Sequence, residues 1–307
     1  MTPDQEDLIE QMKAIGEAVA KTTILSSVLE PVWFKAIEKE ILASPTPSAL
    51  AADRSGFIRS LCHPLRGTDW FEADQHLLLE GRRDEIDADG RFALAMCGVD
   101  PVRTFIPLLE RRLNAFATLP FKQQTVKVKI EQLRTARSDA AFKNHLFEVN
   151  VLGDLALKGA LRDIEESTTA VDGVIDLAGR EILIEATNTV QEVIPRFLGV
   201  FSTDPNVEID QVVKKLHKKV AEGRQLALSK GRPTLLLLAL TPLGAGRDSA
   251  RIAMSECFRA AEFAALSGVV LADSWRFQVT SWHPGEAPDT PLSDAEKEKL
   301  REWYAQR

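Results

Sequence analysis

Cysteine and histidine are too scarce and too scattered in this sequence to form a ligand framework. The three cysteines, Cys62, Cys97 and Cys257, are odd in number and show no metal-clip spacing. They argue against a structural zinc site and favour buried thiols in a reducing compartment. The five histidines show no HExxH or comparable ligand spacing, so the candidate chemistry must come from other residue types.

Long apolar stretches are also missing. The longest, residues 92–97 and 235–240, are too short to span a bilayer. Residues 1–17 are rich in acidic side chains and lack the basic start and apolar stretch of a secretory signal. We therefore expect a protein without membrane association and with a cytoplasmic location.

An excess of positive charge is the third missing feature. The 38 lysine and arginine residues are outnumbered by 45 aspartate and glutamate residues, for a net charge of −7. The molecule as a whole is therefore no obvious polyanion binder, and any contact with nucleic acid must be local. The composition is otherwise that of a folded globular protein, and 307 residues favour about two domains.

The first part of the chain, residues 1–139, is predicted to be a helical domain. Apolar residues recur at three-to-four spacing in two sets, which predict buried helix faces. This region contains no motif that we can connect to chemistry, so its role is open. The two sets are Leu25, Val28, Leu29, Val32 and Trp33, and Ile106, Leu109 and Leu113.

Residues 140–307 are predicted to form an α/β domain with a mixed sheet, because strand-like and helical patterns alternate there. The pattern begins with a helix over 141–159 and a hairpin of strands 171–177 and 181–187. The later elements are a helix over 209–230, a buried strand over 234–240, a helix over 249–267, a strand over 269–272, an edge strand over 277–282 and a terminal helix over 293–306, capped by Ser293 and Glu296.

The strand over 181–187 contains a carboxylate between apolar neighbours, Glu185 between Ile184 and Ala186. A buried carboxylate costs free energy unless it is paired or bound to a cation. Across the predicted hairpin, Asp172 or Asp176 can approach Glu185. Carboxylates held close together repel each other, and a divalent cation that prefers oxygen ligands relieves the repulsion. We therefore expect Mg²⁺, or Mn²⁺, at this place.

Three acidic residues occur in a suggestive order: Glu148 in HLFEVNVLGDLALKG, Asp172 in VDGVID and Glu185 in ILIEATN. A basic helix and the apolar strand TLLLLAL follow. Over residues 140–282 this order resembles the PD-(D/E)XK nuclease superfamily, which has a restriction-endonuclease-like fold. The resemblance implies a metal-dependent hydrolase of phosphodiester bonds, with DNA as the expected substrate. Asp172 is preferred to Asp176 because the family's aspartate opens its strand.

The chain departs from the family pattern at two positions. Val171 stands where the family has proline, and Thr187 stands where it has the lysine of (D/E)-x-K. That lysine positions or activates the attacking water and stabilises charge on the phosphate, whereas a hydroxyl can only position the water. Because the predicted helix over 209–230 is strongly basic, we expect Lys214 or Lys218 to supply the missing cation.

The resemblance implies a full set of site residues. Asp172, Glu185 and the Ala186 carbonyl would bind the metal, Glu148 would support the metal or its water, and Thr187 would position that water. Phosphate contacts along the basic helix are expected from Lys214, Lys215, Lys218, Lys219, Arg224 and Gln225.

Two other hypotheses stay open. The loss of the motif lysine allows a catalytically degenerate nuclease fold that binds nucleic acid or a protein. Alternatively the fold is purely structural, and the helical N-terminal region drives self-association or binds a protein partner. The three hypotheses differ in whether they predict cleavage, metal binding or neither.

Overall fold

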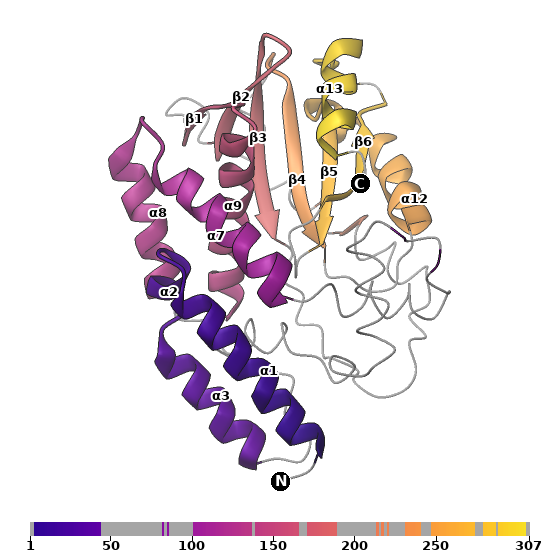
Figure 1. Cartoon of the computed structure of the whole chain (residues 1–307). Coiled ribbons are helices and arrows are strands. Elements are labelled where there is room, and N and C mark those ends of the chain that lie inside the picture. Colours follow the sequence, from indigo (N-terminus) through magenta and orange to yellow (C-terminus); the bar gives the residue numbers. More distant parts are fainter. Residues whose placement is uncertain are drawn as a thin grey trace. The chain divides into compact units, whose positions relative to one another are not determined.

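The structure is a computed structural model of the chain (Figure 1). It describes residues 3–43, 82, 85, 101–136, 139–165, 171–188, 213–214, 216–217, 220, 231–240, 247–273, 279–286 and 288–304. The chain divides into two compact units, one of Met1–Asn114 and Glu131–Lys143, the other of Ala115–Ile130 and Asn144–Arg307. The second unit therefore includes residues that the sequence assigned to the helical domain.

The described part of the first unit is helical. Its helices include α1 (Pro3–Ala20), α2 (Leu25–Val28), α3 (Pro31–Ala43), a π-helical turn (Pro101–Phe105) and the greater part of α7 (Ile106–Ala117).

One of the two predicted helix faces in this unit is confirmed and the other is wrong in part. Ile106, Leu109 and Leu113 are buried along α7. The first set does not form a single face, because the chain leaves helical geometry at Leu29 and Pro31 begins a new helix, α3. Val32, expected in the core, is 59% exposed.

The second unit is built on a mixed sheet, in which six strands are described, in the order β1-β2-β3-β4-β5-β6. The first three strands are antiparallel neighbours, β3, β4 and β5 are parallel, and β6 returns antiparallel (Figure 1). The strands are β1 (Leu161–Ile164), β2 (Gly173–Leu177), β3 (Arg180–Asn188), β4 (Thr234–Leu240), β5 (Gly268–Asp273) and β6 (Val279–Pro284). The α/β class with a mixed sheet is thereby confirmed.

The helices of this unit include parts of α8 (Gln123–Thr135) and α9 (Asp139–Leu157), together with α12 (Arg247–Phe258) and α13 (Asp294–Tyr304). The helix expected over 249–267 ends at Phe258, and a separate 3₁₀ turn (Ala261–Ala265) follows. The predicted capping box is confirmed: the Ser293 N–H donates to the Glu296 carboxylate (2.6 Å), and the Glu296 N–H donates to the Ser293 hydroxyl (3.3 Å). Strand β1 was not foreseen.

The core on one side of the sheet joins alternate residues of β4 and β5 to α12 and the basic helix. Its buried members are Leu216, Leu236, Leu238, Met254, Cys257, Phe263, Leu266, Val269 and Leu271. The Cys257 thiol is free and buried, as expected. β4 is apolar along its length because it lies between two parallel neighbours in the middle of the sheet. In the described residues, every helix is too short or too polar to cross a lipid bilayer.

The close approach of β6 to β5 gives a prediction for stability. A Cβ added at Gly268 would overlap the Trp282 ring and lie 2.9 Å from the His283 carbonyl oxygen. We expect Gly268→Ala to lower the free energy of unfolding by about 3 kcal/mol, measured by urea denaturation. Gly179→Ala serves as a control, because a Cβ there meets nothing within 4 Å. Alanine is strained at a positive φ of 86°, so we expect Gly179→Ala to lose about 1 kcal/mol of unfolding free energy. Equal losses in the two variants would contradict the packing at Gly268.

Candidate functional site

The register of the β2–β3 hairpin brings Asp172 beside the C-terminal part of β3. Gly173 pairs with Ile184, so the residue that precedes β2 lies level with Glu185. The Asp172 carboxylate accepts a hydrogen bond from the Ala186 N–H (2.7 Å), and its carbonyl accepts one from the Glu165 N–H (3.1 Å). Asp172 is thus held to the strands on either side of it.

Glu185 is the most deeply buried carboxylate of this region, with 2% of its surface exposed. It lies in β3 between apolar neighbours and pairs with Leu236 of the parallel strand β4. A carboxylate in such a position requires compensation by hydrogen bonds or by a cation.

Glu148 comes to the same place from α9. Its helix neighbours Phe147 and Val149 are buried, and its own side chain is 16% exposed. Both the Glu148 and the Glu185 charge act on the carboxyl of Asp172. Glu148 and Glu185 are therefore both close enough to Asp172 to influence its carboxyl.

The pKa of Asp172 is raised well above its ordinary value of 3.8. Burial is the largest cause, followed by the negative charges of Glu148 and then Glu185. The hydrogen bond from Ala186 and the charge of Lys129 oppose the rise without cancelling it. Burial and the two neighbouring carboxylates therefore disfavour the charged form of Asp172 more than Ala186 and Lys129 favour it.

Lys129, on α8, is a buried cation in this cluster that the sequence interpretation did not foresee. Only 5% of its surface is exposed, and its ammonium forms ion pairs with Glu148 and, at 2.7 Å, with Glu165. Burial by itself lowers the pKa of this lysine, but the charges and hydrogen bonds of the two glutamates outweigh burial and raise it. Lys129 is therefore positively charged at neutral pH.

The sequence contains a signal that Lys129 is buried. Val126 and Leu133, three residues before it and four after it, are both buried, so the lysine lies on the apolar face of its own helix. A charged residue on such a face is rare unless it is paired. The signal was missed because the resemblance began after this helix.

Lys122 fixes the turn that presents Glu165 to Lys129. Its ammonium donates to the Asp163 carboxylate (3.0 Å) and to the carbonyls of Ile164 (2.6 Å) and Glu165 (2.9 Å). Lys122 and Glu165 both have left-handed backbone conformations, with φ of 46° and 45°. Such conformations persist in non-glycine residues when surrounding contacts hold them.

Asp176, the other aspartate of the hairpin, has a structural role. Its carboxylate accepts hydrogen bonds from the Gly179 N–H (2.9 Å) and from Arg162 (3.1 Å). The Gly179 bond is the main reason that the pKa of Asp176 is lowered. The carboxylate stabilises the turn between β2 and β3.

The remaining predicted residues are only partly described. Ala186 and Thr187 are half-buried on β3, and Lys214 is exposed on the basic helix. The described residues of that helix are helical, and its expected apolar side is confirmed at Leu216. The other predicted phosphate contacts, Lys215, Lys218, Lys219, Arg224 and Gln225, lie outside the described residues.

The cluster fits a hard divalent cation in the type of its donors, because Glu148, Asp172 and Glu185 offer carboxylate oxygens. Within the described ranges, however, no group of three or more Asp, Glu, His or Cys side chains has the arrangement of a metal site. Lys129 engages one of the Glu148 oxygens. A cation that bound here would therefore compete with an ammonium group already present.

No model of a known protein family matches this chain, and no curated protein or solved structure matches it either. The class that the fold and the site define is therefore an α/β protein with a charged cluster beside its β2–β3 hairpin.

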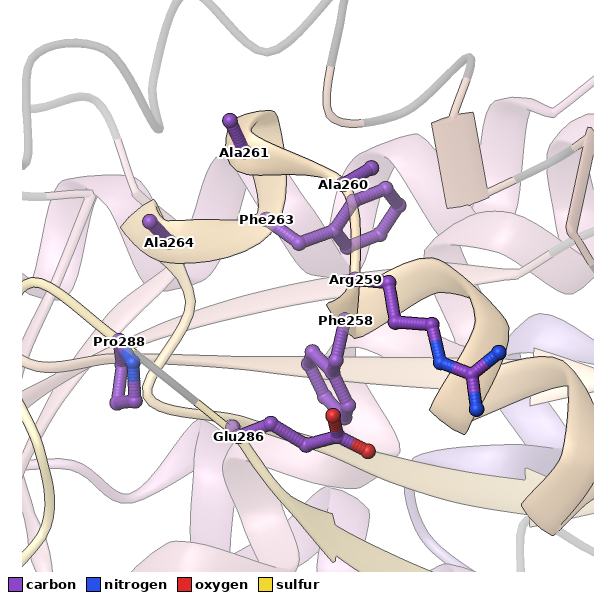
Figure 2. A pocket seen from close by; sticks show the side chains of 9 residues that line it. Phe258, Arg259, Ala260, Ala261, Phe263, Ala264, Glu286 and Pro288 are labelled. Atoms are coloured by element: carbon purple, nitrogen blue, oxygen red, sulfur yellow. The ribbon is translucent and has the colours of Figure 1, made fainter.

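A shallow pocket elsewhere in the unit offers less chemistry. It lies where the end of α12 and the 3₁₀ turn meet the segment after β6 (Figure 2). Phe258, Phe263 and Pro288 give it an apolar lining, and its carboxylate, Glu286, accepts a hydrogen bond from Ser255 (3.1 Å). No residue of the charged cluster lines this pocket.

The raised pKa of Asp172 gives a prediction with a definite sign. Because the folded pKa lies above the unfolded value, ionisation of Asp172 costs stability as the pH rises from about 4 through the folded pKa. In metal-free buffer we therefore expect Asp172→Asn to raise Tm by about 2–4 °C at pH 7.5, and by less at pH 5. Thermal unfolding measured by circular dichroism provides the comparison.

Asp176→Asn is the matched control, since the lowered pKa of Asp176 predicts an unchanged or reduced Tm at pH 7.5. A fall in the Tm of Asp172→Asn at pH 7.5 would contradict the expected cost of ionising Asp172 in its buried place.

Proposed function

We propose that the protein is a metal-dependent phosphodiesterase of the PD-(D/E)XK type that hydrolyses DNA. The observation that supports it best is that the Asp172 carboxylate is hydrogen-bonded to the Ala186 N–H, next to Glu185, with the charges of Glu148 and Glu185 both acting on it. These are the residues that the resemblance named as ligands. Stability alone gives no reason to gather them, because like charges in a buried place repel each other.

The order of elements in the second unit also supports the proposal. A helix with Glu148 precedes an antiparallel hairpin with Asp172 and Glu185, and a buried parallel strand, β4, lies on the far side of β3. The restriction-endonuclease-like fold has the same succession of helix, hairpin and buried strand. Fold by itself does not define an activity, so the proposal depends on the site.

In this proposal Asp172, Glu185 and the Ala186 carbonyl hold Mg²⁺ or Mn²⁺, and Glu148 orients the attacking water. When bound, the metal lowers the pKa of that water and shields the leaving oxygen. The attacking water would give up a proton to solvent as its oxygen bonds to phosphorus, and the leaving oxygen would take up a proton from solvent as its bond to phosphorus breaks. The half-buried Thr187 hydroxyl lies two residues beyond Glu185 on β3, where it can help to position the water.

The first test of this function is Glu185→Gln, which keeps the shape of the side chain and removes its charge. We expect Mg²⁺- or Mn²⁺-stimulated cleavage of single- or double-stranded DNA by the wild type, measured by gel electrophoresis of labelled fragments. The variant should lose at least about 100-fold of that rate. Glu181→Gln is the control on the same strand, because Glu181 is exposed and its 3.3 Å pair with Arg232 contributes little. Full activity in Glu185→Gln would refute the assignment.

The binding module is the second candidate, favoured by the neutral Thr187 and by the ion pair that already engages Glu148. For this function we expect no turnover with any divalent metal. The affinity for DNA should fall as salt rises and should fall further when Lys214 and Lys218 are replaced by Glu. Fluorescence anisotropy of a labelled oligonucleotide measures both effects.

A further inference from the structure

Lys129 occupies a position that an apolar residue would fill at lower cost. Its helix neighbours Val126 and Leu133 are in the core, and only 5% of the lysine itself is exposed. Burying an ammonium group is expensive even when it is paired, and a well-packed apolar replacement for a buried ion pair is often equally or more stable. The position of this cation therefore calls for a reason other than stability.

The positive charge of Lys129 acts on carboxylates of the candidate active site. It reaches Glu148 by direct contact and lowers the pKa of Asp172 through space. The motif position on β3 that should hold a lysine is occupied by Thr187, which has no charge. Helix α8 therefore supplies to the candidate site the positive charge that position 187 of β3 lacks.

The hydrogen bonds of Lys129 leave capacity for a ligand. An ammonium group has three N–H donors. In the part of the chain that the structure describes, Glu148 and Glu165 accept from two of them. The third can serve a phosphate oxygen, and the ion pair lies at the edge of the buried cluster, because the Lys129 side chain is 6% exposed and that of its partner Glu165 is 52% exposed.

We propose that Lys129 is the cationic catalytic residue of this site and that it contacts the phosphate of the substrate in place of the lysine absent at position 187. This inference rests on the proposed phosphodiesterase function. Before substrate binds, Lys129 balances Glu148 and Glu165. With substrate in place, its ammonium stabilises the negative charge that grows on the phosphate oxygens.

The experiment first removes the lysine at position 129 on α8 and then introduces a lysine at position 187 on β3. Lys129→Met removes the charge at similar length and should reduce Mn²⁺-dependent cleavage of DNA by about 100-fold. Adding Thr187→Lys to that variant returns a cation to the motif position and should restore at least about tenfold of the loss. Lys127→Met is the matched control on the same helix, because Lys127 is exposed, and it should cleave DNA as the wild type does.

A second readout does not depend on activity. Calorimetry should show that Lys129→Met binds Mn²⁺ at least as tightly as the wild type, because the variant removes a competing cation from Glu148. Weaker Mn²⁺ binding would mean that Lys129 only shapes the ligand set, and it would overturn the proposal. Failure of Thr187→Lys to rescue a folded Lys129→Met protein would overturn it as well.

The outcomes separate this inference from the function on which it rests. If the wild type cleaves DNA and Lys129→Met cleaves equally well, the phosphodiesterase function is supported and the role proposed for Lys129 is refuted. If the wild type shows no cleavage, both the phosphodiesterase function and the role of Lys129 are refuted. If Lys129→Met does not fold, Lys129→Arg keeps the charge and the ion pairs but changes the donor geometry. That variant should lose at least about tenfold in rate, and an unchanged rate would overturn the role of Lys129.

Discussion

The charge balance around one buried ammonium group is the interaction on which the candidate site depends. Glu148, Asp172 and Glu185 place negative charge in a region of low exposure, and burial and mutual repulsion raise the pKa of Asp172. Lys129 offsets part of that charge and is itself kept protonated by Glu148 and Glu165. Removing one partner alone would leave the charge of the other buried and unpaired, which costs stability.

The sheet fixes the positions of these charged side chains. The antiparallel register of β2 and β3 sets Asp172 level with Glu185, and the Ala186 N–H fixes the aspartate's carboxylate. On the other side, Lys122 holds the turn after β1, from which Glu165 reaches Lys129. Backbone pairing thus positions the acidic groups, and side-chain contacts position the cation.

Much of the second unit was predictable from local pattern. The apolar run of β4, the capping box of α13 and the hairpin around residues 178–179 have strong local signals, and the structure confirms each of them. Elements with weaker signals were less well predicted. Strand β1 has only four residues, and α12 ends earlier than its apolar periodicity indicated. In the first unit, Pro31 ended a periodic pattern that otherwise looked like one helix.

By itself, the sequence singled out Glu185, because a carboxylate between apolar residues on a strand is visible as a conflict in local pattern, whereas Glu148 and Asp172 were named through the resemblance. It also determined that position 187 has no positive charge. Only the tertiary structure decided which cation meets these groups. Lys129 is distant in sequence from its partners Glu148 and Glu165, and no local rule connects α8 with α9 or with the turn after β1. That pairing follows from the packing of the parts of α8 and α9 that carry Lys129 and Glu148 in one compact unit with the sheet, which is a property of the tertiary fold.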